Sequence, residues 1–119
     1  MIVNIPFCED FRLAMLTGRK TATSRTKRYG AGGDRFRAFG AWFTILDVQT
    51  LRLETIACEH YAAEGFDSPE AFRSVWIALH PRRGWQAEQA VWFHEFKRMS
   101  MRLYAAGENR HRNPHSREK

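Results

Sequence analysis

The sequence predicts a single small α+β domain whose sheet is curved or closed. Its 119 residues match one domain, and a chain of this length buries enough surface to sustain its own core. The hydrophobic share of 44% and the aromatic share of 13% are typical of a folded protein and exclude a wholly disordered chain. The expected elements follow in the order helix, strand, strand, helix, helix, strand, without an internal repeat, which favours an α+β architecture.

The first expected element is a helix over residues 6–17. Pro6 suits an early helical position, acidic residues follow it in the first turn, and Gly18 suits the end of the helix. The apolar residues of this segment recur near helical spacing, which predicts one buried face.

A basic segment rich in hydroxyl groups follows this helix. From Arg19 to Arg37 the chain holds seven Lys and Arg residues against one Asp, and Thr, Ser and Gly residues interrupt them. Guanidinium groups, hydroxyls and exposed backbone amides together suit an oxyanion or phosphate site, and a solvated charged surface is the alternative. The first part is expected to be a loop that enters an extended segment, in which Thr21, Thr23 and Arg25 share one face.

Glycines and aromatic runs delimit the central strands. A glycine-rich turn at residues 29–33 precedes two expected strands over 34–39 and 41–50, which Gly40 separates. The second of these strands is rich in Trp, Phe, Ile and Val, as expected for a strand that contributes to the core.

Two helices and a closing strand complete the expected domain. The first helix is expected over residues 53–64, with Gly65 as its stop. The sequence Ser-Pro-Glu at 68–70 predicts the start of the second, with Ser as N-cap and Pro at the first helical position. This helix is expected to end near His80, and the closing strand is expected over residues 90–96.

The C-terminal segment is expected to lie outside the domain. We place the domain at residues 1–98 and a basic tail at 99–119, and most of the net charge of +6 resides in residues 97–119. Residues 97–106 favour a short helix, whereas residues 107–119 are polar and almost free of apolar side chains, so we expect them to be disordered.

The composition indicates a cytoplasmic protein with an anionic partner. No window of the sequence approaches a membrane span, and the N-terminus lacks a basic leader, so neither a membrane association nor a signal peptide is expected. Cys8 and Cys58 form no CxxC pair and are expected to be reduced thiols. The histidines show no metal-ligand spacing, and the excess positive charge favours anionic partners.

Four segments together resemble the ASCH domain. They are Leu16–Arg25, which reads LTGRKTATSR, then Gly33-Asp34 at a strand start, His60–Ser68 and the aromatic strand Val91–Phe96. The resemblance covers about residues 1–98. It implies a PUA-like fold, which is a small β-barrel with flanking helices.

Within that group the chain is similar to the small bacterial N4-acetylcytidine amidohydrolases. These enzymes remove the acetyl group from the exocyclic amine of acetylated cytidine. The resemblance implies no metal, no cofactor and an acylated nucleoside or RNA as partner, and it leaves the oligomeric state open. Carried over to this sequence, it implies the catalytic residues Lys20, Thr23 and Glu64. The substrate-binding residues that we expect beside them are Arg19, Thr21, Arg25 and His60.

These residue types can supply the chemistry of amide hydrolysis. The reaction needs an activated nucleophile, a proton donor for the leaving amine and a stabiliser for the oxyanion. The Thr23 hydroxyl is the expected nucleophile, and Lys20 is its expected base if burial and neighbouring cations lower the Lys20 pKa. Glu64 can move the proton or position a water, and Arg25 or backbone amides can hold the oxyanion.

Two other functions fit the same residues. Other ASCH proteins are linked to RNA binding or RNA cleavage, and one of Tyr29, Phe36 and Phe39 is a candidate for stacking on a base. The shape of the site discriminates between these hypotheses. A nucleoside-sized pocket favours the amidohydrolase, and an open basic groove favours an RNA-binding module or a single-stranded RNA nuclease.

Overall fold

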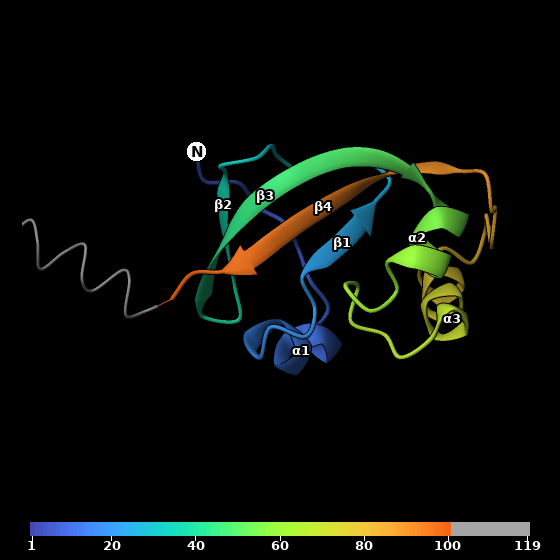
Figure 1. The fold of residues 1–119 in the computed structure, drawn as a ribbon, viewed down its shortest axis with the longest axis horizontal. Helices are drawn as coiled ribbons and strands as arrows, with labels where there is room; N and C mark the ends of the chain where they lie inside the picture. Colours follow the sequence, from blue (N-terminus) through green and yellow to red (C-terminus); the bar gives the residue numbers. More distant parts are fainter. Residues whose placement is uncertain (101–119) are drawn as a thin grey trace, which may run out of the picture.

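The structure is a computed structural model that describes residues 1–100, and it has one four-stranded antiparallel sheet (Figure 1). The strand order is β1-β4-β3-β2, so that β1 and β2 form the two edges of the sheet. The strands are β1 (Ala22–Arg25), β2 (Arg35–Ala38), β3 (Ala41–Arg52) and β4 (Ala90–Arg98). The helices are the 3₁₀ turn η1 (Glu9–Phe11), α1 (Arg12–Leu16), α2 (Leu53–Glu59) and α3 (Pro69–Leu79).

The long strand β3 makes the sheet curl. Its first residues pair with β2, while nearly its whole length pairs with β4, and the register shifts between Ile45 and Asp47. An irregularity of this kind bends a strand and increases its twist. Figure 1 shows β3 arching over β4 and β1 as a result. The predicted α+β class with a curved sheet is confirmed.

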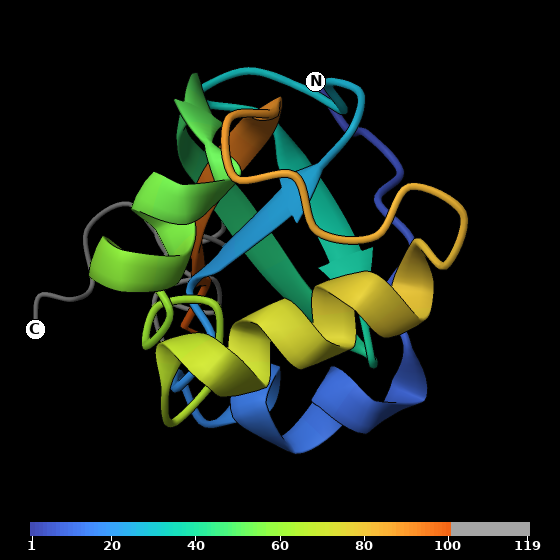
Figure 2. The same ribbon diagram turned by 90° about the vertical axis from the view of Figure 1, so that its right-hand side faces the viewer.

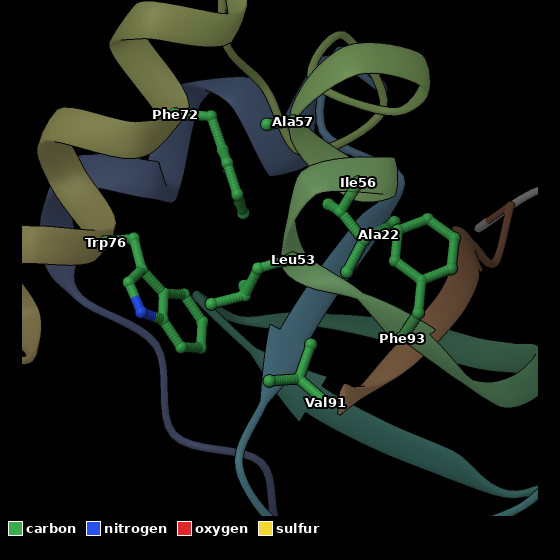
Figure 3. Packing of buried hydrophobic residues seen from close by; sticks show 8 residues of the cluster. All are labelled: Ala22, Leu53, Ile56, Ala57, Phe72, Trp76, Val91 and Phe93. Carbon is green, nitrogen blue, oxygen red and sulfur yellow. The ribbon is translucent and has the colours of Figure 1, made fainter. Parts of the chain in front are cut away.

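One hydrophobic cluster fills the space between the sheet and the two helices that follow β3. Figure 3 shows its buried side chains, which come from β1, β4, α2 and α3. They are Ala22, Leu53, Ile56, Ala57, Phe72, Trp76, Val91 and Phe93. This cluster holds α2 and α3 against the β1 edge of the sheet. The candidate site lies at the same edge.

A second cluster is dominated by phenylalanine rings. Phe36 and Phe43 stack from paired positions of β2 and β3 with ring centroids 5.2 Å apart, and Phe96 contacts both rings edge-on. Each buried ring contributes about 1.5–3 kcal/mol through the area it removes from water. Met15 of α1 is fully buried in the same cluster, which fixes the N-terminal segment to the sheet.

The predicted start of α3 is confirmed in atomic detail. Ser68 is the N-cap, and its Oγ accepts a hydrogen bond from the backbone N–H of Ala71 at 3.1 Å. Pro69 occupies the first helical position, where its missing N–H is not needed. The helix ends at Leu79, next to the expected boundary at His80.

Three predicted helices differ from the structure. The first is confined to residues 9–16. The helix expected over 53–64 ends at Glu59, and a series of turns follows it, because the carbonyl of Ala63 accepts hydrogen bonds from the start of β1. The helix expected over 97–106 is wrong where it can be compared, since β4 continues through Arg98; the rest of it and the expected disordered tail lie outside the described residues.

Within residues 1–100, none of the helices has the length and apolar character that crossing a membrane requires. Both cysteines are free and exposed.

Candidate active site

A cavity of about 340 Å³ lies beside the edge strand β1. Its walls come from β1, from α3 and from the N-terminal segment around Pro6 and Phe11. Figure 1 shows β1 between α1 on one side and α3 on the other, and Figure 2 shows α3 below β1. The volume falls in the range of small-molecule sites, about 300–1,000 Å³. The side chains of the lining that carry polar or ionisable groups include Cys8, Lys20, Thr23, Ser24, Arg25, Thr26, Tyr29, Glu64 and His80.

Lys20 is buried at the polar end of this cavity, with 2% of its surface exposed. Its Nζ donates hydrogen bonds to the carbonyl oxygens of Ala22 at 2.8 Å and of Glu64 at 2.9 Å, and it contacts Glu64 Oε1 at 3.5 Å. An ammonium has three donors, and these three acceptors use all of them. The ring of Phe11 covers the same nitrogen at 4.5 Å from its centroid. This geometry fits a charged Lys20.

Glu64 is the other half of a buried ion pair. One carboxylate oxygen, Oε1, faces Lys20, and the other, Oε2, accepts a hydrogen bond from Ser24 Oγ at 2.5 Å. Burial raises the pKa of Glu64, against the opposing effects of the Lys20 charge and the Ser24 hydrogen bond. Burial likewise lowers the pKa of Lys20, against the opposing effect of Glu64. Glu64 is therefore held as a stronger base than an exposed carboxylate.

The turn that carries Glu64 is bonded directly to the strand that carries the hydroxyl groups. The carbonyl of Ala63 accepts hydrogen bonds from the N–H groups of Thr21 and Ala22, at 2.7 and 3.0 Å. Gly65 then reverses the chain with φ of +98°, a conformation that glycine adopts readily. A Cβ at this position would lie 3.1 Å from the Cβ of Lys20. Lys20 and Glu64 are thus placed by backbone contacts as well as by their charges.

Thr23 and Arg25 form a second polar pair on the wall of the cavity. Arg25 Nε donates to Thr23 Oγ1 at 3.1 Å, which confirms that the two side chains share one face. Arg25 Nη2 donates to the carbonyl of Pro6 at 2.6 Å, and its guanidinium packs on the rings of Phe7 and Tyr29. These contacts fix a cation beside the Thr23 hydroxyl.

His94 of β4 contacts the backbone of the segment that forms this wall. It is fully buried, with Nδ1 close to the carbonyl oxygens of Trp92 (3.1 Å) and Thr23 (3.3 Å), while Nε2 accepts the N–H of Tyr29 at 3.0 Å. These partners fit a neutral imidazole with its proton on Nδ1. Burial lowers the pKa of His94, which favours the same form.

The structure brings together four of the seven predicted site residues. Lys20, Thr23, Arg25 and Glu64 all line the cavity. The other three lie outside its lining. Arg19 is exposed and pairs with Asp67 at 3.7 Å, Thr21 uses its backbone to join neighbouring segments, and the ring of His60 packs on Phe93.

Ser24 is a site residue that the sequence did not indicate. In the GRKTATSR segment it follows the second Thr, and the resemblance to the amidohydrolases assigns it no role. No sequence signal marks its partner, because Glu64 lies 40 positions away. The contact becomes visible only when the turn after α2 is bonded to β1.

The cavity contains little that would hold a metal ion. Among residues 1–100, no group of three or more His, Cys, Asp or Glu side chains is placed to bind one. Glu64 is the one carboxylate in the lining contributed by the described part of the chain, and Lys20 occupies one of its oxygens.

Removing one member of the buried pair should destabilise the protein much more than removing both. Lys20→Met leaves Glu64 without its counter-charge, and we expect it to lower the free energy of unfolding by about 3–5 kcal/mol at neutral pH. The double variant Lys20→Met/Glu64→Gln removes both charges and should recover most of that loss. Denaturant unfolding measures all three proteins. A double variant less stable than Lys20→Met would contradict the pairing.

Gly65→Ala should destabilise the protein beyond the effect of its backbone conformation. A left-handed residue other than glycine costs about 1–2 kcal/mol. Gly33→Ala is the matched control, because Gly33 has φ of +95° and a Cβ there would meet nothing within 4 Å. We expect Gly65→Ala to lose more stability than Gly33→Ala in denaturant unfolding, because its Cβ presses on Lys20. Equal losses would show that this contact has no energetic effect.

Comparison with known proteins shows the fold. No family model matches the chain, and no curated protein matches its sequence. Among solved structures, an ASCH domain from Lactobacillus crispatus superposes with a TM-score of 0.56 and 16% identity over 77% of this chain and 76% of that one.

Two further structures give similar values. The hypothetical protein PH0355 superposes with a TM-score of 0.60 and 14% identity over 78% of this chain and 94% of that one. The protein EF3133 from Enterococcus faecalis superposes with a TM-score of 0.56 and 18% identity over 76% of this chain and 70% of that one. The chain therefore has the PUA-like α+β fold of an ASCH domain.

Proposed function

We propose that the protein is an amidohydrolase that removes the acetyl group from N4-acetylcytidine or a related acylated nucleoside, without a metal ion. The observation that carries the proposal is the buried contact between Lys20, Glu64 and Ser24 at the polar end of a cavity of about 340 Å³. A buried carboxylate whose pKa is raised, placed in such a cavity, is typical of a catalytic base.

Glu64 is the general base and acid of the proposed reaction. It accepts the proton of the attacking oxygen and returns it to the exocyclic nitrogen when the amide bond breaks. Lys20 is not the base, since its three donors are used by three acceptors. Its charge instead keeps Glu64 ionised in a buried position and holds one of its oxygens.

Thr23 and Arg25 stabilise the oxyanion of the tetrahedral intermediate. The oxygen of Thr23 accepts the hydrogen bond from Arg25 Nε, so its own proton is free to be donated to the substrate. The positive charge of Arg25 strengthens that donor. Preorganised donors of this kind contribute about 3–4 kcal/mol to acyl transfer.

The apolar walls suit a planar base and a small acyl group. Helix α3 contributes Val75, Trp76 and Leu79, and Tyr29 lies on the β1 side. Leu79 lines the cavity and is exposed to solvent. Of the three aromatic residues that the sequence offered for stacking on a base, Tyr29 lines the cavity. Phe36 is buried in the second cluster, and the ring of Phe39 packs under Arg12.

The rim of the cavity favours a substrate that carries phosphate, and this supports RNA as the second candidate. Lys27 and Arg28 are exposed in the loop that directly follows the lining residue Thr26. Lys27 packs on Tyr29 at 4.9 Å, and Arg28 on Trp92 at 5.3 Å. The same cavity can therefore hold a modified base at the end of an RNA strand, or bind RNA without hydrolysis.

The test measures, by chromatography, the release of cytidine from N4-acetylcytidine. We expect turnover by the unchanged protein and a loss in kcat of about 10²–10⁴-fold in Glu64→Gln, because proton transfer is removed. Glu59→Gln, an exposed Glu at the end of α2, is the matched control and should keep full activity. Circular dichroism checks that each variant is folded.

Two results would overturn the amidohydrolase. One is the absence of cytidine release, and the other is full turnover by Glu64→Gln. Fluorescence anisotropy with short single-stranded RNA tests the second candidate in parallel. Binding that weakens steeply with salt, together with no hydrolysis, would identify an RNA-binding module in place of the enzyme.

A further inference from the structure

We propose that Ser24, rather than Thr23, is the nucleophile of this reaction, and that it carries the acyl group as an ester intermediate. The inference rests on the proposed function and deepens it. It follows from three features of the site, which are the partner of each hydroxyl, the group that orients the base and the register of β1.

The first feature is that the hydrogen bond to the base belongs to Ser24. Its Oγ donates to Glu64 Oε2 at 2.5 Å, a length typical of a hydroxyl bonded to a carboxylate. The Thr23 hydroxyl instead accepts from Arg25 Nε at 3.1 Å. A hydroxyl within hydrogen-bonding reach of a base is the structural signature of an activated nucleophile. Thr23 has the environment of an oxyanion donor.

The second feature is that a third group orients the base. Lys20 Nζ contacts the other oxygen of Glu64 and also bonds the Glu64 carbonyl and the Ala22 carbonyl. Ser24, Glu64 and Lys20 thus form a chain of nucleophile, base and orienting group. This is the arrangement by which hydrolases activate a hydroxyl, built here with a carboxylate as the base.

The third feature is the alternation of side chains along β1. Thr23 is paired with His94, which is outside the cluster under α2, whereas Ser24 is paired with Phe93, which belongs to that cluster. Successive strand residues face opposite sides, so Ser24 lies on the side where the turn with Glu64 is bonded to β1. Ser24 nevertheless lines the cavity, because β1 is an edge strand.

The proposed reaction is complete with the acylated nucleoside and water as its only reactants. Glu64 takes the Ser24 proton while Oγ bonds the acyl carbon, and the carbonyl electrons move to the oxygen, which Thr23 and Arg25 stabilise. The intermediate collapses, the C–N bond breaks, and Glu64 protonates the leaving amine of cytidine. Water then attacks the ester, Glu64 takes its proton and returns it to Ser24, and the carboxylic acid leaves.

The experiment maps the acylated residue with an activated ester. The protein is mixed with p-nitrophenyl acetate, which needs no nucleoside recognition, and quenched in acid. The acetylated peptide is then fragmented to separate Ser24 from Thr23. We expect one acetyl group on Ser24 and a burst of p-nitrophenolate. We expect no acetylation at this peptide in Ser24→Ala, and a slow thioester in Ser24→Cys.

Turnover of N4-acetylcytidine gives the second readout. Ser24→Ala should lower kcat by about 10²–10⁴-fold with KM little changed. Thr23→Val, which keeps the shape of the side chain, should slow the reaction but retain acetyl-Ser24. Acetylation of Thr23, or full turnover by Ser24→Ala, would overturn the assignment. Acetyl-Ser24 from the ester, without hydrolysis of N4-acetylcytidine, would retain the nucleophile and reject the proposed substrate.

Discussion

The buried ion pair between Lys20 and Glu64 is the contact on which the site depends. Taking two charges out of water is unfavourable, and a well-packed apolar pair of similar size often gives a more stable protein. This chain instead keeps both groups almost completely buried, with every donor of Lys20 satisfied. A buried pair that raises the basicity of a carboxylate is typical of a functional site.

The curled sheet gives this pair its surroundings. Because β1 lies at an edge, one of its sides is free to form the wall of a cavity while β4 holds the other. The turn after α2 is bonded to the start of β1 through Ala63, and α3 closes the opposite wall. The site is therefore rigid on the polar side, where chemistry needs fixed geometry, and apolar on the side that receives the ligand.

Much of the fold was predictable because its signals are local, while part of the site was not. The cap at Ser68, the glycine turns and the apolar strands are encoded by neighbouring residues. Lys20, Thr23 and Glu64 were predicted through a resemblance of motifs. Ser24 was missed, and the helix expected before Glu64 ran too far, for the same reason. Both depend on the pairing of a turn with a strand some 40 residues away, which no local pattern reveals.

The central claim is that Glu64 is a buried base beside the Ser24 hydroxyl. Its most direct test is the titration of Glu64 in the ligand-free protein, monitored by ¹³C NMR of the side-chain carboxyl. The burial of Glu64 predicts a midpoint above the ordinary value of about 4.3 for glutamate. It also predicts a chemical shift that responds to Ser24→Ala, because Ser24 donates to the carboxylate. A midpoint at or below the ordinary value, unchanged in Ser24→Ala, would contradict a buried base poised at this hydroxyl.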